Sequence, residues 1–94
     1  MLTEYFIQYV KDIRGVSQSS AKHYVQALNT INSLLDRYNF KIRDVFILSS
    51  IDDLELVDAF LNNNVEYQEK DKVGHRMYSV AFKHYCRFIL WFYQ

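Results

Sequence analysis

The chain has 94 residues, no proline, one cysteine, and 11 basic residues against 11 acidic ones, so its formal charge is zero. Half of the residues are hydrophobic and 17% are aromatic, which excludes a disordered chain and is enough for a core that needs no disulfide or metal. The neutral total gives no support to nucleic-acid or membrane binding through overall charge. We therefore expect a single domain over residues 1–94, in which only local charge patterns can indicate a function.

Two helices are predicted in the first 38 residues. A helix over 2–13 follows from apolar residues at spacings of three and four: Leu2, Phe6, Tyr9, Val10 and Ile13. Gly15 suits a left-handed C-terminal cap after this helix, and Ser17 is a natural N-cap for a longer helix that ends near Arg37. The apolar face of the longer helix consists of Ala21, Tyr24, Val25, Leu28, Ile31, Leu35 and Tyr38.

The middle of the chain contains one clear helix. Residues 40–50 mix β-branched and aromatic side chains without a helical period, so they fit either a short strand or an irregular connection. Ser50 with Asp53 resembles a capping box that has Asp in place of Glu, and it predicts a helix over 51–61. The inward positions of that helix are Leu54, Val57, Phe60 and Leu61.

A polar segment and a final helix follow. Residues 62–75 are polar and contain Gly74, which predicts a loop with at most one helical turn. From about Arg76 to Tyr93 a helix is predicted, with Lys83 and Arg87 almost in line with Arg76 opposite the apolar face. That face consists of Tyr78, Ala81, Phe82, Tyr85, Phe88, Ile89 and Phe92. The fold class is therefore all-α, a small bundle of four to five helices.

Charge is unevenly distributed along the chain. Residues 52–69 contain six acidic residues and no Lys or Arg, whereas residues 70–94 contain five basic residues and one acidic residue, Asp71. This asymmetry predicts an electric dipole, with one face that can meet phosphates and another that repels them. An ordinary solvated helix face is the simpler interpretation of the three cations on the final helix.

Several kinds of chemistry have no residues to support them. No Asp or Glu has Lys two positions later, as restriction nucleases commonly require, and two glycines cannot form a phosphate-binding loop. The three histidines are not at ligand spacing, and Cys86 on an apolar helix is more simply a buried thiol than a nucleophile. We expect no catalytic site, no cofactor and no metal in this chain.

The ends of the chain also indicate where the protein works. Residues 1–15 lack the basic start and apolar run of a signal peptide, and Lys83, His84 and Arg87 interrupt the apolar C-terminal stretch. A single cysteine excludes an internal disulfide. These features favour a cytoplasmic protein without a membrane partner.

Residues 5–35 carry a family resemblance. A short helix, then Arg14 and Gly15, then a helix capped by Ser17 with Tyr24 near its start, is similar to the N-terminal SAM-like, or core-binding, domain of tyrosine recombinases and phage integrases. IDDLELVDAFL resembles the third helix of that domain, and MYSVAFKHYCRFILWF resembles its last. ALNTINSLL and KDKVGHRMYSVAFKHYCRF are closer to the version that precedes the nuclease or ATPase part of bacterial restriction proteins, including HNH endonucleases.

The resemblance implies a function in DNA binding. In that family the module contacts the duplex on behalf of a catalytic domain, so this chain is expected to be the N-terminal, non-catalytic module of a larger restriction or recombination enzyme of bacterial defence. The DNA-binding residues that it implies are Arg14, Ser17, Ser19, Lys22, Lys72, His75, Arg76, Lys83 and Arg87. Helix starts and basic side chains of this kind contact backbone phosphates rather than bases. Simple capping is an equally good role for Ser17.

Two other functions remain open. Leu90, Trp91, Phe92 and Tyr93 surround the last helical turn, and a helix that is apolar on all sides is normally covered. This favours a protein-interaction or homo-oligomerisation module as the alternative. A stand-alone regulator of a phage or defence system is a third possibility.

Overall fold

The structure is a computed structural model that describes residues 1–48 and 50–93, so Ser49 in the 40–50 connection and Gln94 at the aromatic end lie outside the described residues. It contains five α-helices, one short 3₁₀ helix and, within those residues, no strand. The predicted all-α class is therefore confirmed. The elements are α1 (Thr3–Asp12), α2 (Gln18–Arg37), η1 (Val45–Ile47), α3 (Ile51–Asn62), α4 (Val65–Val73) and α5 (Met77–Phe92).

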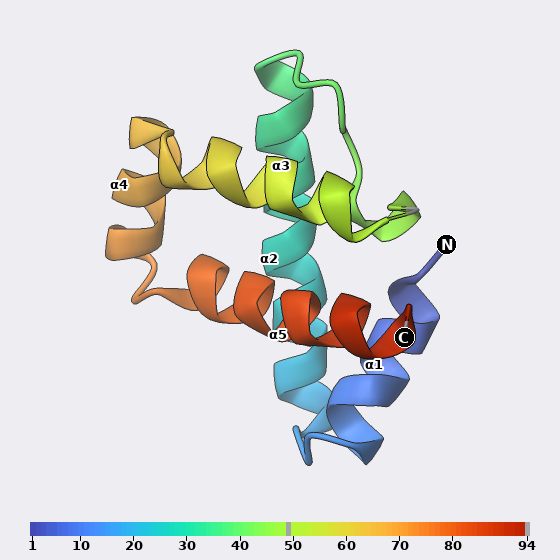
Figure 1. The fold of residues 1–94 in the computed structure, drawn as a ribbon. Helices are drawn as coiled ribbons and strands as arrows, with labels where there is room; N and C mark the ends of the chain where they lie inside the picture. Colours follow the sequence, from blue (N-terminus) through green and yellow to red (C-terminus); the bar gives the residue numbers. More distant parts are fainter. Residues whose placement is uncertain (49, 94) are drawn as a thin grey trace.

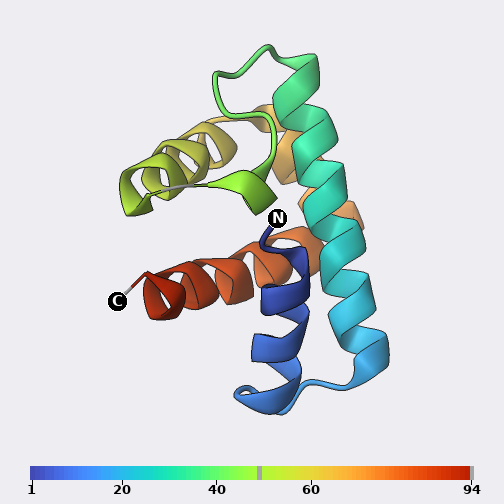
Figure 2. The same ribbon diagram turned by 90° about the vertical axis from the view of Figure 1, so that its right-hand side faces the viewer.

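The other helices are arranged around the long helix α2. Helices α3 and α5 cross it on one side and run antiparallel to each other, while α4 joins them at one end (Figure 1). In the turned view α1 lies beside the first half of α2, and α3 and α5 project together away from α2 (Figure 2). The most extensive helix contact is between α2 and α5. The crossing of these two helices therefore fixes how the candidate residues at the start of α2 lie relative to those of α5.

Local capping explains where the helices begin. Gly15 has a φ of 69°, the left-handed conformation expected after α1. The Ser17 hydroxyl accepts a hydrogen bond from the Ser20 amide at 3.1 Å, and the Ser50 hydroxyl accepts one from the Asp53 amide at 3.2 Å. Both predicted N-caps are thus confirmed.

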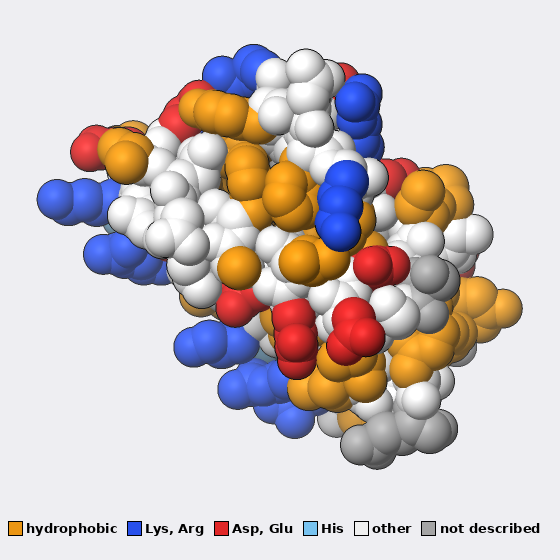
Figure 3. Space-filling view, turned by 45° about the horizontal axis from the view of Figure 1, so that its top comes forward, with side chains coloured by type: hydrophobic (Ala, Val, Ile, Leu, Met, Phe, Trp, Pro, Cys, Tyr) orange, Lys and Arg blue, Asp and Glu red, His pale blue; other side chains and the backbone are white. Residues whose placement is uncertain are grey.

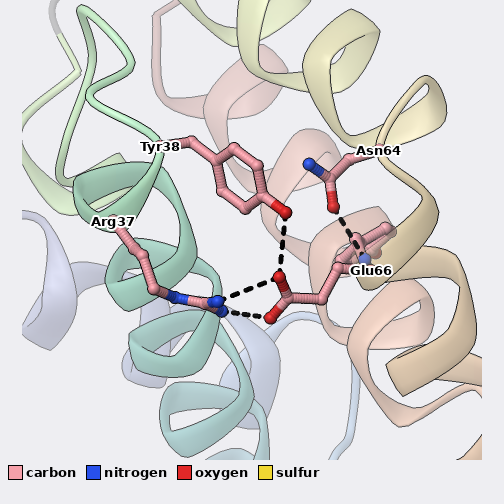
Figure 4. Close-up of polar contacts among 5 residues, drawn as sticks. Arg37, Tyr38, Asn64 and Glu66 are labelled. Atoms are coloured by element: carbon pink, nitrogen blue, oxygen red, sulfur yellow. Dashed lines mark hydrogen bonds and ion pairs between the residues drawn. The ribbon is translucent and has the colours of Figure 1, made fainter.

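The loop predicted over residues 62–75 is wrong, because most of it forms α4. The side chain of Asn64 accepts a hydrogen bond from the Tyr67 amide at 2.8 Å and caps the helix. Glu66 in its first turn forms an ion pair with Arg37 and accepts a hydrogen bond from the Tyr38 hydroxyl at 2.9 Å (Figure 4). Only Tyr67 and Asp71 of α4 are buried, so this helix has no apolar stripe for sequence periodicity to detect.

Aromatic rings from the two ends of the chain form the centre of the core. Phe6 of α1 lies 5.2 Å from Tyr85 and 5.6 Å from Phe88 between ring centroids, in edge-to-face geometry. The predicted inward faces are largely buried, but Ile13 and Tyr38 at helix ends are exposed, and Ala27 and Leu34 are buried in addition.

The connection before α3 is irregular and is hydrogen-bonded to tyrosines at the C-terminal end of the chain. Residues 45–47 form the 3₁₀ turn rather than a strand. The Tyr85 hydroxyl donates a hydrogen bond to the Val45 carbonyl at 2.5 Å, and the Tyr93 hydroxyl donates one to the Leu48 carbonyl at 2.6 Å. Across the described helices, none combines the length and the apolar character that crossing a membrane requires.

Candidate nucleic-acid interface

The fold divides the candidate residues among three places. Arg14, Ser17, Ser19 and Lys22 belong to the α1–α2 turn and the start of α2, whereas Lys72, His75 and Arg76 belong to the end of α4 and the turn into α5. Lys83 and Arg87 lie one turn apart on α5. The crossing of α2 and α5 determines which of these residues become neighbours.

His84 of α5 contacts helix α2. Its ring stacks on Tyr24 of α2, with centroids 4.8 Å apart and planes 24° apart. Burial lowers the pKa of His84, and the nearby positive charges of Arg87 and Arg14 lower it further. The charges of Arg14 in the α1–α2 turn and of Arg87 in α5 therefore both act on the same imidazole ring and favour its neutral form.

The surface around this stack, which we call the α2–α5 face, contains Arg14, Ser19, His23, His84 and Arg87. His23 lines a shallow hollow together with Met77 and Tyr78 of α5, and Ser19 is exposed one turn before His23 on the same side of α2. Helix α5 contains no acidic residue, and α2 contains only Asp36, near its far end. Within the described residues neither arginine has an ion-pair partner, so this face carries uncompensated positive charge.

Two candidates at the start of α2 do not contribute a free group to this face. The Ser17 hydroxyl accepts a hydrogen bond from the Ser20 amide, because Ser17 is the N-cap of α2. Lys22 lies two residues before Tyr24, about 160° around the helix from the ring that stacks on His84, so it lies on the side of α2 away from the stack.

The turn between α4 and α5 is built around a buried carboxylate. His75 and Arg76 both have left-handed φ values, 56° and 66°, and Arg76 provides no side-chain cap for α5. Instead, Asp71 of α4, which is 4% exposed, accepts a hydrogen bond from the Ser79 amide at 2.9 Å. The Arg76 guanidinium lies 3.7 Å from the other oxygen of Asp71, so its charge is largely compensated.

Gly74 is required by close packing in this turn. A Cβ atom at this position would lie 3.0 Å from the Tyr78 ring and 3.2 Å from the Lys70 carbonyl oxygen. Lys72 and His75 on either side of Gly74 are exposed. Their side chains are therefore available to a ligand at the edge of the hollow that His23 lines.

Lys83 faces a different region from Arg87. Together with Arg76 it lines a groove of about 650 Å³ between α3 and α5, whose opposite wall carries Glu55 and Asp58. In the space-filling view, basic side chains at the lower left lie close to acidic ones near the centre (Figure 3). The straight row of Arg76, Lys83 and Arg87 along α5 is thus divided between an acid-lined groove and the α2–α5 face.

The described residues contain no group of three or more His, Cys, Asp and Glu side chains that could hold a metal ion. Burial raises the pKa of the Cys86 thiol to about 12, so the reactive thiolate is scarce at neutral pH. The Tyr67 and Tyr85 hydroxyls have raised pKa values because of burial and stay protonated.

Comparison of the chain with known protein families, curated proteins and solved structures finds no significant match.

Sequence reasoning did not identify His84 or Tyr24 as part of the candidate site. Tyr24 has the spacing of a core residue, and His84 lies in a run with Lys83 and Arg87 that looks like a solvated helix face. Their stacking depends on the crossing of α2 and α5. No local sequence signal specifies that crossing.

Proposed function

We propose that this chain is a non-catalytic module that binds the phosphate backbone of duplex DNA through the α2–α5 face, on behalf of the catalytic domain of a restriction or site-specific recombination enzyme. The observation that carries the proposal is that Arg14 and Arg87, which both disfavour the charged form of His84, are exposed and have no ion-pair partner among the described residues. The resemblance of residues 5–35 to core-binding domains supports the same class of ligand.

The chemistry of the face suits phosphate rather than base edges. Two guanidinium groups attract phosphate oxygens and can donate paired hydrogen bonds to them. The start of α2 adds backbone amides that have no partner within the helix, and the exposed hydroxyl of Ser19 lies beside them. Such contacts fix the position of a protein on the duplex and give no direct sequence readout.

The acidic residues of α3 limit the side from which DNA can approach. Glu55 and Asp58 of α3 lie across the α3–α5 groove from Lys83, and they repel phosphates on that side. DNA is therefore expected to approach the carboxylate-free surface of α2 and α5 rather than the groove. The neutral total charge means that this attraction is local, so binding should be moderate and strongly salt-sensitive.

A double variant tests the face directly. We expect R14A/R87A to weaken binding to a labelled duplex at least about 30-fold at about 50 mM salt, because hydrogen bonds to charged groups contribute about 1.5–3 kcal/mol each. The measurement is fluorescence anisotropy. The matched control is K41A/K70A, which removes the same charge from exposed residues outside the face and should change the affinity less than about threefold. Equal losses in both variants would show that only net charge matters.

DNA binding should also depend on the protonation of His84. Its pKa is lowered in the free protein, and a phosphate placed between Arg14 and Arg87 would favour the charged imidazole and raise that pKa. Binding then takes up a proton, so affinity should rise as the pH falls from about 8 to about 5.5. H84Q should reduce this pH dependence, whereas H75Q should leave most of it in place; identical pH profiles for wild type and H84Q would contradict this role.

A second candidate function rests on the aromatic end of α5. Trp91 is 51% exposed and lines a hollow with Tyr5 of α1 and Ile13 just after that helix, which are 59% and 52% exposed. Exposed apolar side chains that lie together favour a protein-interaction or self-association surface. Sedimentation at increasing protein concentration tests it: concentration-dependent association with no DNA binding would favour this function, and a monomer at all concentrations would argue against self-association.

A further inference from the structure

The α3–α5 groove is long, apolar at its base and closed at one end. Helices α3 and α5 form its two sides, and α4 joins them (Figure 1). The base is formed by side chains of Leu54, Leu61 and Phe82, and Leu90 near the far end is 44% exposed. From Arg76 to Leu90 the groove follows α5 for about 21 Å, or about four helical turns.

The two walls of the groove have opposite charges that do not neutralise each other. Glu55 and Asp58 are exposed on the α3 wall, and Lys83 is exposed on the α5 wall. The ion pairs of the described residues are Arg37–Glu66, Arg43–Asp36 and Arg76–Asp71, so none of them joins the acidic wall to Lys83. A ligand between the walls can therefore satisfy both charges at once.

We propose that this groove docks an amphipathic helix of a partner protein that has an apolar ridge, a basic edge facing α3 and an acidic edge facing Lys83 on α5. The apolar ridge would cover the base of the groove and Leu90. A helix satisfies its own backbone hydrogen bonds and packs between two antiparallel helices as another member of the bundle. DNA is excluded from this groove by the repulsion between phosphates and the α3 carboxylates.

Peptides that differ only in the charges of their two edges test the proposal. The probe is a labelled helical peptide of about 18 residues with a leucine ridge, one lysine edge and one glutamate edge. Two matched peptides keep the ridge and carry lysine on both edges or glutamate on both edges. We expect the mixed peptide to bind at least about tenfold more tightly than either matched peptide, measured by fluorescence anisotropy.

Variants of the walls then identify the groove as the binding site. K83E and D58K should each weaken binding of the mixed peptide about tenfold, and K83E should strengthen binding of the all-lysine peptide. The triple variant E55K/D58K/K83E exchanges the charges of the two walls and should recover the mixed peptide, because reversing the direction of a docked helix exchanges its two edges. All three side chains are exposed, and circular dichroism checks that the fold is intact.

Equal affinity for the three peptides, or single variants that bind like the wild type, would overturn the proposal. Failure of the triple variant to recover binding would also overturn it. R14A/R87A should bind the mixed peptide as the wild type does, because these arginines do not line the groove. Loss of DNA binding and loss of peptide binding are therefore separate outcomes.

Discussion

Replacing Phe88 with alanine is expected to lower the free energy of unfolding by about 3–5 kcal/mol, because it opens a cavity in the aromatic centre of the core. The ring is fully buried, and its centroid lies 5.6 Å from Phe6, 5.5 Å from Tyr9 and 5.6 Å from Tyr85. Since small domains are stable by only about 5–15 kcal/mol, F88A should be close to unfolding. Urea denaturation followed by circular dichroism measures the change.

The matched control for F88A is V80A on the same helix. Val80 is 41% exposed, so its truncation should change the free energy of unfolding by less than about 0.5 kcal/mol. A loss below about 1.5 kcal/mol in F88A would mean that α5 does not pack against α1 as described.

Removal of the Asp71 carboxylate is expected to have the second largest effect. D71A should lower the free energy of unfolding by about 2 kcal/mol, because the half-buried Ser79 amide loses its acceptor and the start of α5 loses its side-chain cap. D71N retains an oxygen acceptor and should cost less than half as much. Thermal or urea unfolding of the two variants, beside D58A as an exposed control, distinguishes the hydrogen bond from the charge.

Equal losses in D71A and D71N would show that the negative charge near Arg76 and the start of α5 matters, rather than the hydrogen bond. A loss in D71A no larger than that in D58A would contradict the capping role altogether. In either case the α2–α5 face should be unaffected, because Asp71 lines the α3–α5 groove.

Helices with an apolar stripe and a side-chain cap could be predicted from the sequence. The starts of α2 and α3 lie next to Ser17 and Ser50, and both hydroxyls accept the expected hydrogen bond. Gly15 marks the end of the first helical segment with a left-handed φ. Each of these signals acts within a few residues, which is why the sequence alone was enough.

Helix α4 and the helix ends could not be predicted in the same way. The polar helix α4 is held by the Asn64 cap and by the contact of Glu66 with Arg37, which joins residues distant in sequence. Ile13 and Tyr38 continue the periodicity of α1 and α2, but they lie just after the helix ends and stay about half exposed, although Tyr38 contacts Phe60 of α3. Tertiary contacts therefore decide both cases.

The candidate site shows the same division between local and tertiary information. Arg14 and Arg87 could be chosen from the sequence as basic residues, but the effect of both charges on His84 depends on how α2 and α5 cross. Lys83, only one turn from Arg87, faces the acid-lined groove instead. Sequence reasoning could identify the charged residues, and the fold determines which of them act together.

Binding of a duplex DNA by the wild-type protein over a series of salt concentrations is the most direct measurement of the central proposal. Each neutralised phosphate contributes about −0.9 to the slope of log K against log salt, so two arginine contacts predict a slope of about −2 that R14A/R87A abolishes. A wild-type affinity that does not change with salt, or no binding at the lowest salt by a folded protein, would contradict a phosphate-binding role for the α2–α5 face.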